Sequence, residues 1–319
     1  MPAKQNKEDS AMVLIRSMFA VILVVCSPGT SAQPIATSFV SDGVDIPAFL
    51  QRTGDGEPRA VVINLHGNPG ARIRAESALA THLSTQGVDT FWFNYRGIWG
   101  NPGSYSLTNG IGDLRAAIDF LKGADARKRF GLGNAPIILT GYSFGSAVAL
   151  LGAAADDRVA GVVAYAPCDL GYFGQELANP QSRIKKFIDE GIEGIFGPKG
   201  PVPGGGPAFT GDLITNLQSN AFPRIAPALQ KKALLFLAGR DDVVCPVEDH
   251  FFPLYRALRS AQHPQLDAHI LNTGHAFDRA TATTLNQMTA AWILQSFPSH
   301  PTKGAAIDSP ERPPKLPRP

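Results

Sequence analysis

The sequence predicts an α/β fold, with a mostly parallel central sheet, helices on both of its faces and a small cap insertion. Continuous apolar runs of strand length alternate along the chain with amphipathic helical patterns. Such runs are typical of parallel strands that are buried on both faces. The length of 319 residues and the 44% of hydrophobic residues suit one large domain rather than two.

The expected elements can be placed in chain order. An antiparallel pair over residues 37–53 comes first, with its turn at Ser41-Asp42-Gly43. Later strands are predicted where apolar runs end in turn residues, at 61–65, 90–95, 136–140, 159–166, 233–238 and 268–271. Helices are predicted where the apolar pattern has a helical period, at 72–86, 112–122, 146–151, 247–260 and 281–295.

The N-terminus has the pattern of a secretory signal peptide. Lys4, Lys7 and Arg16 precede an apolar segment at 18–25 that is too short to span a bilayer. Small residues follow, and we expect cleavage after Ala32. The mature protein is then exported, either periplasmic or secreted, and keeps no stable membrane anchor. The expected segments are a signal peptide at 1–32, an α/β domain at 33–298 and a disordered Pro-rich tail at 299–319.

An insertion at residues 168–232 interrupts the alternation, because it is too long for a single crossover. A short helix is expected at 181–195. The Gly- and Pro-rich stretch at 197–207 favours no regular structure, and it lacks the spacing of a phosphate-binding loop. We interpret the insertion as a small cap with a mobile rim. An unstructured surface insertion is the alternative.

Charge and motif content exclude several classes of partner. A formal net charge of +2, with no basic run interleaved with aromatic residues, offers no electrostatic basis for binding nucleic acid. The chain has no H-E-x-x-H motif and no cysteine pair that would indicate a metal site. We therefore expect no cofactor, no metal and no nucleic acid.

The most informative motif is Gly141-Tyr142-Ser143-Phe144-Gly145, a G-x-S-x-G. It follows a strand-like run and precedes a helical run, so that Ser143 lies on the turn between them. A turn this tight strains the backbone of the serine and lifts its hydroxyl above the edge of the sheet, while the flanking glycines let neighbouring elements approach. Ser143 is the predicted nucleophile.

A serine nucleophile needs a base, an acid that orients the base and a site for the oxyanion. His275 is the candidate base, because it lies in a tight turn just past a strand-like stretch. Asp242 is the candidate acid, in the turn after the apolar run 233–237. Asp241 and Asp169 are the alternatives.

The oxyanion site is predicted from main-chain groups. Asn68 follows the strand at 61–65, and Phe144 directly follows the nucleophile at the start of a helix. The N–H group of each residue can point at a developing oxyanion, and the helix dipole favours the negative charge. His66 is expected to fix this loop rather than to act as a base.

A set of motifs extends over residues 60–295: His66-Gly67, Asn94 to Gly97, Gly103-Ser104, Asp113, Gly141 to Gly145, Gly239, Asp242, Pro246 and Gly274-His275. With these motifs the chain resembles the serine α/β-hydrolase superfamily, in particular its compact single-domain esterases and aminopeptidase-like hydrolases. The resemblance implies the α/β-hydrolase fold and a catalytic triad in the chain order Ser143, Asp242, His275. Ser146 departs from many relatives, which have a second glycine after the nucleophile turn. We expect little functional consequence.

Two cysteines remain after cleavage at the predicted site, Cys168 and Cys245. Each follows a predicted strand, and the two strands are expected to be neighbours, so both cysteines lie past the same edge of the sheet. In an oxidising compartment they can form a disulfide that braces the acid turn. Two ordinary half-buried thiols are the alternative.

These residues predict hydrolysis of a small-molecule carboxylic ester through an acyl-enzyme. An aminopeptidase or amidase on the same scaffold is the first alternative. An aminopeptidase would need an acidic group in the cap to bind the substrate ammonium, and Glu176, Asp189 and Glu190 are available. A catalytically inactive binding protein is the second alternative.

Other polar residues are expected to have structural roles. Arg96 and Asp113 are expected to tie loops together rather than to touch substrate, and His269 to be packed within its strand. Four histidines are expected at the surface: His82, His250, His263 and His300.

Overall fold

The structure, a computed structural model, describes residues 33–182 and 194–298. The predicted signal peptide with its cleavage site and the C-terminal tail lie outside these residues, as does most of the helix expected at 181–195. No helix in the described ranges is both long and apolar enough to cross a membrane.

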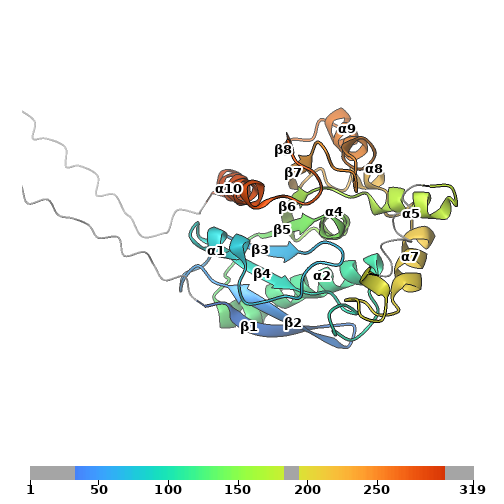
Figure 1. Ribbon diagram of the computed structural model, residues 1–319. Coiled ribbons are helices and arrows are strands. Elements are labelled where there is room, and N and C mark those ends of the chain that lie inside the picture. The colour runs from blue at the N-terminus through green and yellow to red at the C-terminus, as the bar shows by residue number, and fades with distance from the viewer. Residues whose placement is uncertain (1–32, 183–193, 299–319) are drawn as a thin grey trace, which may run out of the picture. The chain divides into compact units, whose positions relative to one another are not determined.

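The central element is a sheet of eight strands in the described part of the chain, in the order β1-β2-β4-β3-β5-β6-β7-β8 (Figure 1). β2 is antiparallel to both β1 and β4, and every later pair of neighbours is parallel. The prediction of an antiparallel pair followed by a parallel sheet is confirmed. The strands are β1 Ile35–Ser41, β2 Val44–Gln51, β3 Ala60–Leu65, β4 Val88–Phe93, β5 Ile137–Tyr142, β6 Val159–Tyr165, β7 Ala233–Gly239 and β8 Leu266–Leu271.

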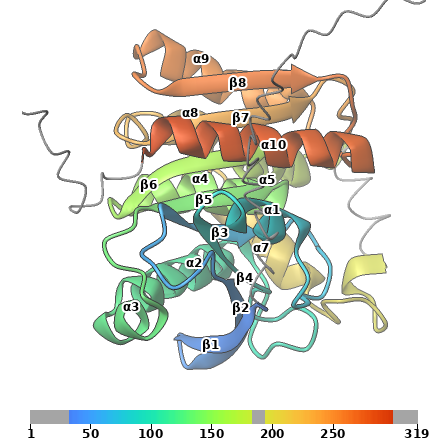
Figure 2. The ribbon, with the colours of Figure 1, turned by 90° about the vertical axis from the view of Figure 1, so that its left-hand side faces the viewer.

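Helices cover both faces of the sheet, and Figure 2 shows α10 in front of the strands. α1 and α10 pack together on one face, and α2 and α4 pack together on the other. Alternate side chains of each strand point to opposite faces. Val62 therefore joins the core under α1 and α10, whereas Ile63 joins the core under α2 and α4. These helices are α1 Ala78–Ser84, α2 Leu107–Lys122, α4 Phe144–Ala155 and α10 Arg279–Ser296.

The first predicted helix is shorter than expected. Of the range 72–86, only Ala78–Ser84 is helical, with Ser77 as its N-cap. The residues before it are held by β4 and the loop that follows, because the side chains of Trp92 and Asn94 make hydrogen bonds to the main chain at 71–74. Contacts with a distant strand thus override the local helical pattern.

Two further helices differ from the prediction. The helix expected at 247–260 begins with a π-helical turn, Val247–Phe251, and continues as α9, Phe252–Ser260. Pro253 in the first turn of α9 has no N–H to donate, which suits the start of a new helix. The short helix α3, Ala124–Phe130, was not predicted.

The described part of the insertion includes the helices α5 (Leu170–Ala178), α7 (Gly206–Thr215) and α8 (Phe222–Ile225). α5 and α7 pack against each other beyond the carboxyl ends of the parallel strands (Figure 1). Most of the stretch 197–207 is irregular, but its last two residues begin α7, since proline is well tolerated in a first helical turn. The described part of the insertion therefore consists largely of packed helices, and we keep the name cap for it.

Gly145 makes a close backbone approach just after the nucleophile turn, because a Cβ there would collide with the carbonyl oxygen of Leu65. We expect Gly145→Ala to lower the free energy of unfolding by about 1–3 kcal/mol, since the backbone must shift to admit the methyl group. Urea unfolding followed by circular dichroism measures the change.

Gly211→Ala is the matched control. Gly211 lies in α7 with open space around its Cβ position, so alanine should be neutral or should raise stability by about 0.5–1 kcal/mol. Equal losses in the two variants would contradict the role given to Gly145.

Candidate active site

Ser143 lies on the turn that joins β5 to α4, where its backbone has φ 54° and ψ −118°. Residues other than glycine seldom adopt a positive φ, and the strain is of the order of 1–3 kcal/mol. The N–H of Ser143 donates to the carbonyl of Tyr165 at the end of β6 (3.0 Å), which ties the turn to the neighbouring strand. The hydroxyl is thereby presented at the carboxyl end of the sheet.

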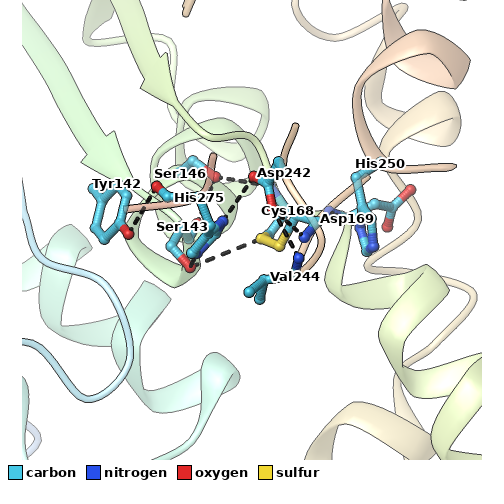
Figure 3. Close-up of polar contacts among 10 residues, drawn as sticks. Tyr142, Ser143, Ser146, Cys168, Asp169, Asp242, Val244, His250 and His275 are labelled. Atoms are coloured by element: carbon cyan, nitrogen blue, oxygen red, sulfur yellow. Dashed lines mark hydrogen bonds and ion pairs between the residues drawn. A yellow bond between two sulfur atoms is a disulfide. The ribbon is translucent and has the colours of Figure 1, made fainter. Parts of the chain in front are cut away.

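Three side chains from separate loops meet at this point (Figure 3). His275 Nε2 lies 2.9 Å from Ser143 Oγ, and His275 Nδ1 lies 2.7 Å from Asp242 Oδ2. One neutral tautomer satisfies both contacts: the Ser143 hydroxyl donates to Nε2, and Nδ1–H donates to the carboxylate. The hydroxyl of Tyr142 donates to the carbonyl of His275 (3.1 Å) and steadies the histidine loop. The structure thus brings together the nucleophile, base and acid expected from the sequence.

The carboxylate of Asp242 is held by its own turn. Its Oδ1 atom accepts the main-chain N–H groups of Val244 (2.9 Å) and Cys245 (2.8 Å), while Oδ2 faces His275. Asp241 is exposed instead and pairs with the arginine before it (3.2 Å). Asp242, rather than Asp241, is therefore the carboxylate that reaches His275.

Asp169, the other alternative acid, supports the cap. Its Oδ1 accepts the N–H groups of Gly171 and Tyr172 in the first turn of α5, and its Oδ2 accepts that of Phe222 at the start of α8. The side chain is buried, and burial raises the pKa of its carboxyl to about 6. Both oxygens of Asp169 thus serve to join two cap helices.

His250 is buried, so the expectation that it lies at the surface is wrong. Its Nδ1 accepts the main-chain N–H of Asp169 (3.0 Å), and its ring packs against Tyr172 and Phe173, at 5.0 Å from each. Burial lowers the pKa of His250 to about 4, so the imidazole is neutral near pH 7. The helical spacing of the sequence could have indicated this burial, because His250 lies on the same buried face of the helix as Val247.

Two other histidine predictions are also wrong. His263 is buried rather than exposed, and its Nε2 lies 3.0 Å from the carbonyl oxygen of Leu229. His269 is exposed rather than packed, because β8 is an edge strand whose side chains largely face solvent. His82 is partly exposed, and His300 lies outside the described residues.

The loop after β3 forms one side of the site. His66 Nδ1 lies 2.7 Å from the carbonyl oxygen of Gly67, and the loss of solvent around the ring lowers the pKa of His66 to about 4. Its ring packs against Tyr95, with centroids 4.5 Å apart. Asn68 follows and is joined to Pro69 by a cis peptide bond. His66 is therefore a neutral residue that shapes this loop, as expected.

A cavity of about 260 Å³ opens beside Ser143 and His275. Asn68 and Phe144, the two oxyanion candidates, both lie on its wall. The other lining residues are Cys168, Leu170, Phe173, Ile195, Phe196, Phe209, Leu213, Val244 and Cys245. Apart from His275, no lining residue in the described part of the chain is charged or titratable in this structure, so the wall is largely apolar.

Phe209 of α7 connects the cap to the nucleophile turn. Its ring stacks on Tyr105 at 5.4 Å and lies 5.8 Å from the ring of Phe144, which directly follows Ser143. Phe196 also packs against it, at 5.3 Å. Such aromatic pairs contribute about 0.5–1.5 kcal/mol each beyond their burial. The cap is therefore anchored on Phe144, the residue that follows Ser143.

Cys168 and Cys245 form a disulfide, with Cα atoms 5.4 Å apart. Of the two arrangements that the sequence left open, the structure has the disulfide.

In the ranges that the structure describes, the only group of three potential metal ligands consists of these cysteines and His275. The sulfur atoms are bonded to each other and both nitrogens of His275 are in hydrogen bonds, so this group offers no ligand atom to an ion.

Arg96 and Asp113 tie loops together, as expected. Arg96 Nε lies 2.7 Å from Asp113 Oδ1. The terminal nitrogens of Arg96 reach Asp42 (3.1 Å) and Ser41 (2.6 Å), at the turn after β1. Arg96, Asp113 and Ser41 are buried, whereas Asp42 is exposed. The cluster fixes the loop after β4 to the first turn and to α2, and none of its members lines the cavity.

Comparison with known proteins points to hydrolases. Residues 56–185 match the family model described as serine aminopeptidase, S33. Over 173 residues the chain is 25% identical to the quorum-quenching protein AidA of Acinetobacter baumannii, and the match covers 52% of this chain and 55% of that protein. The chain thus spans little more than half the length of this curated relative.

Solved structures with the same fold include an esterase and a peptidase. The esterase Pf2001 of Pyrococcus furiosus superposes with a TM-score of 0.57 at 17% identity, covering 82% of this chain and 90% of that one. A puromycin-hydrolysing peptidase of Mycobacterium tuberculosis superposes with a TM-score of 0.61 at 18% identity, covering 86% of this chain and 41% of that one. At these identities the likeness shows the fold.

His250 makes the stability of the fold depend on pH. Its pKa of about 4 in the folded protein lies below its ordinary value of 6.5, so between these values the unfolded chain binds a proton that the folded protein does not. The free energy of unfolding therefore decreases as the pH drops through this window. This one group accounts for a decrease of about 2–3 kcal/mol at pH 4.5.

His250→Asn tests this prediction, because it removes the titrating ring and keeps an acceptor for the N–H of Asp169. Urea titrations at pH 7 and pH 4.5 give the unfolding free energies of both proteins. Between these pH values the wild type should lose about 2 kcal/mol more than the variant. Equal losses would show that His250 is protonated in the folded state.

Proposed function

We propose that this chain, a hydrolase of the α/β-hydrolase superfamily, cleaves carboxylic esters with Ser143 as nucleophile, His275 as base and Asp242 as the acid that orients the base. One observation carries the proposal: an unbroken row of contacts runs from Ser143 Oγ through both nitrogens of His275 to Asp242, at 2.9 and 2.7 Å. These distances are within reach for direct proton transfer.

In the first half of the reaction, the ester carbonyl lies in the cavity beside Ser143. Oγ attacks the carbonyl carbon while Nε2 of His275 takes the proton, and the carboxylate of Asp242 stabilises the imidazolium that forms. The main-chain N–H groups of Asn68 and Phe144 stabilise the oxyanion, each by about 3 kcal/mol. His275 then protonates the departing alcohol, which leaves the acyl group on Ser143.

In the second half, water attacks the acyl-enzyme along the same path. His275 takes a proton from the water, and the bond between Ser143 Oγ and the acyl carbon breaks. The proton returns to Ser143, and the carboxylic acid leaves the cavity. Both halves use the same three side chains and the same main-chain donors, and neither requires a cofactor.

The cavity wall favours an ester with an uncharged acyl group over the substrate of an aminopeptidase. An aminopeptidase has to bind an ammonium group, and the lining residues that the structure describes include no carboxylate. Glu176 accepts a hydrogen bond from Ser182 Oγ (2.7 Å) instead, and Asp189 and Glu190 lie outside the described residues. An alcohol is also a better leaving group than an amine, so its departure requires less assistance from the active-site residues.

Hydrolysis of an amide bond is the second candidate. The family model that matches residues 56–185 is described as a serine aminopeptidase, and a peptidase shares the fold. The same row of side chains would serve this reaction, with an amine as the leaving group. A binding protein on an inactive scaffold is the third candidate, and the intact row argues against it.

We also propose that the protein acts outside the cytoplasm on small-molecule esters. The N-terminal segment has the composition of a signal peptide. The Cys168–Cys245 disulfide suits an oxidising compartment.

Ser143→Ala tests the proposed nucleophile. We expect the wild type to hydrolyse p-nitrophenyl esters between acetate and decanoate, and the variant to lose at least about 1000-fold in kcat, because the acyl-enzyme can no longer form. The absorbance of released p-nitrophenolate measures the rate of hydrolysis by each protein. A fluorophosphonate should label the wild type and leave the variant unlabelled. A wild type that is labelled but hydrolyses no ester would favour the amide alternative. A wild type that is neither labelled nor active on any ester would contradict the proposed nucleophile.

Phe209→Ala tests which part of the cavity holds the acyl chain. Removal of this ring opens the wall at α7, so we expect the preferred ester to become longer by roughly two to four carbons. Values of kcat/KM across the ester series measure the shift. Ile214→Ala is the matched control, since Ile214 is on the same helix, is 39% exposed and does not line the cavity. An unchanged optimum in Phe209→Ala would show that the acyl chain lies elsewhere.

A further inference from the structure

The disulfide lies between the loops that carry the acid and support the nucleophile. Cys168 follows β6 and Cys245 follows β7, 77 residues apart in sequence. The two strands are parallel neighbours, so both loops leave the same edge of the sheet. The bond therefore joins two loops beyond the ends of their strands, where main-chain pairing no longer holds them together.

On one side, the disulfide is continuous with the acid turn. The N–H of Cys245 donates to Asp242 Oδ1 (2.8 Å), while Oδ2 of the same carboxylate faces His275 Nδ1 (2.7 Å). A carboxylate is rigid and planar, so a movement that alters the first contact also alters the second. The position of Cys245 therefore helps to set the direction in which Asp242 faces the base.

On the other side, the disulfide reaches the nucleophile turn. The N–H of Cys168 donates to Ser146 Oγ (3.1 Å), and Ser146 Oγ donates to the carbonyl of Ser143 (2.5 Å). Cys168 Sγ also lies 3.8 Å from Ser143 Oγ (Figure 3). Ser146 thus couples the Cys168 loop to the nucleophile turn, a role that the sequence did not indicate.

We propose that the Cys168–Cys245 disulfide is a positioning element that keeps Asp242 aligned with His275, and that its reduction by small thiols lowers kcat reversibly. The inference rests on the proposed function, since it requires Asp242 to act on the reaction through His275. Catalysis is sensitive to such alignment, because a misplacement of about 1 Å can cost roughly 100-fold in rate.

The reduction needs only a thiol as co-reactant. A thiolate attacks one sulfur atom of the disulfide, forms a mixed disulfide and releases the other cysteine as a thiolate, which takes up a proton. A second thiolate then attacks the mixed disulfide. The products are Cys168 and Cys245 as thiols and the reagent as its own disulfide.

The substrate cavity is the route by which the thiol arrives. Both cysteines are only 2% exposed, yet both line the cavity together with Ser143 and His275. A group bound covalently to Ser143 would fill the cavity beside the sulfur atoms, since Cys168 Sγ lies 3.8 Å from Ser143 Oγ. Occupation of the cavity should protect the disulfide.

Reduction of the purified protein with dithiothreitol tests the positioning role. Mass spectrometry after alkylation with iodoacetamide counts the free thiols. We expect kcat on a p-nitrophenyl ester to fall at least about tenfold, KM to change less than about twofold, and both to recover on reoxidation. Complete reduction with an unchanged kcat would overturn the inference. A protein that hydrolyses no ester before reduction would instead contradict the proposed function.

A double-mutant cycle distinguishes positioning from a general effect on stability. Asp242→Asn is introduced into the wild type and into the Cys168→Ala/Cys245→Ala protein. If the disulfide acts through Asp242, the substitution should cost about tenfold less in kcat where the disulfide is absent. Equal costs in both backgrounds would assign the disulfide to stability alone. If the double-alanine protein does not fold, the same comparison is made on wild type and Asp242→Asn before and after reduction.

The route through the cavity has its own test. Protein labelled at Ser143 with a fluorophosphonate should be reduced at least about tenfold more slowly than unlabelled protein, because access to the sulfur atoms limits the exchange. Ser143→Ala exposed to the same reagent is the control and should be reduced at the unlabelled rate. Equal rates for labelled and unlabelled protein would overturn this route.

Discussion

The backbone of Ser143 has a φ of 54°, which costs of the order of 1–3 kcal/mol, and the site depends on the interactions that hold it there. The carbonyl of Tyr165 on the neighbouring strand accepts the N–H of Ser143 (3.0 Å). The helix that follows is buried over residues 144–153, so its packing offsets the strain. Because the turn is so tight, the hydroxyl projects past the end of β5, where loops from other strands can reach it.

The order of the strands decides which loops those are. β6, β7 and β8 follow β5 side by side and in parallel, so the loops that carry Cys168, Asp242 and His275 leave the same edge of the sheet. Each loop is then held by another. Asp242 contacts His275, the hydroxyl of Tyr142 holds the His275 carbonyl, and the disulfide joins the first two loops. The geometry of the site therefore depends on all of these loops together, and a displacement of one loop would alter the contacts that the others make.

The cap supplies the apolar side of the site, and two sets of contacts hold it in place. Phe209 packs on Tyr105 and on Phe144, and the buried carboxylate of Asp169 joins the starts of α5 and α8. An apolar wall excludes water from the cavity, and hydrogen bonds are stronger in such surroundings than in water. The cap therefore places apolar side chains beside His275 on the wall of the cavity.

The sequence by itself determined the alternation of strands and helices, the strained serine turn and the placement of the acid and the histidine on loops, because these features follow from local periodicity and turn chemistry. Only the tertiary structure decided which distant groups meet. Asp241 and Asp242 occupy the same turn and differ in the direction of their side chains, and only Asp242 faces His275. The Cys168–Cys245 bond depends on strand order and register, which local patterns do not encode.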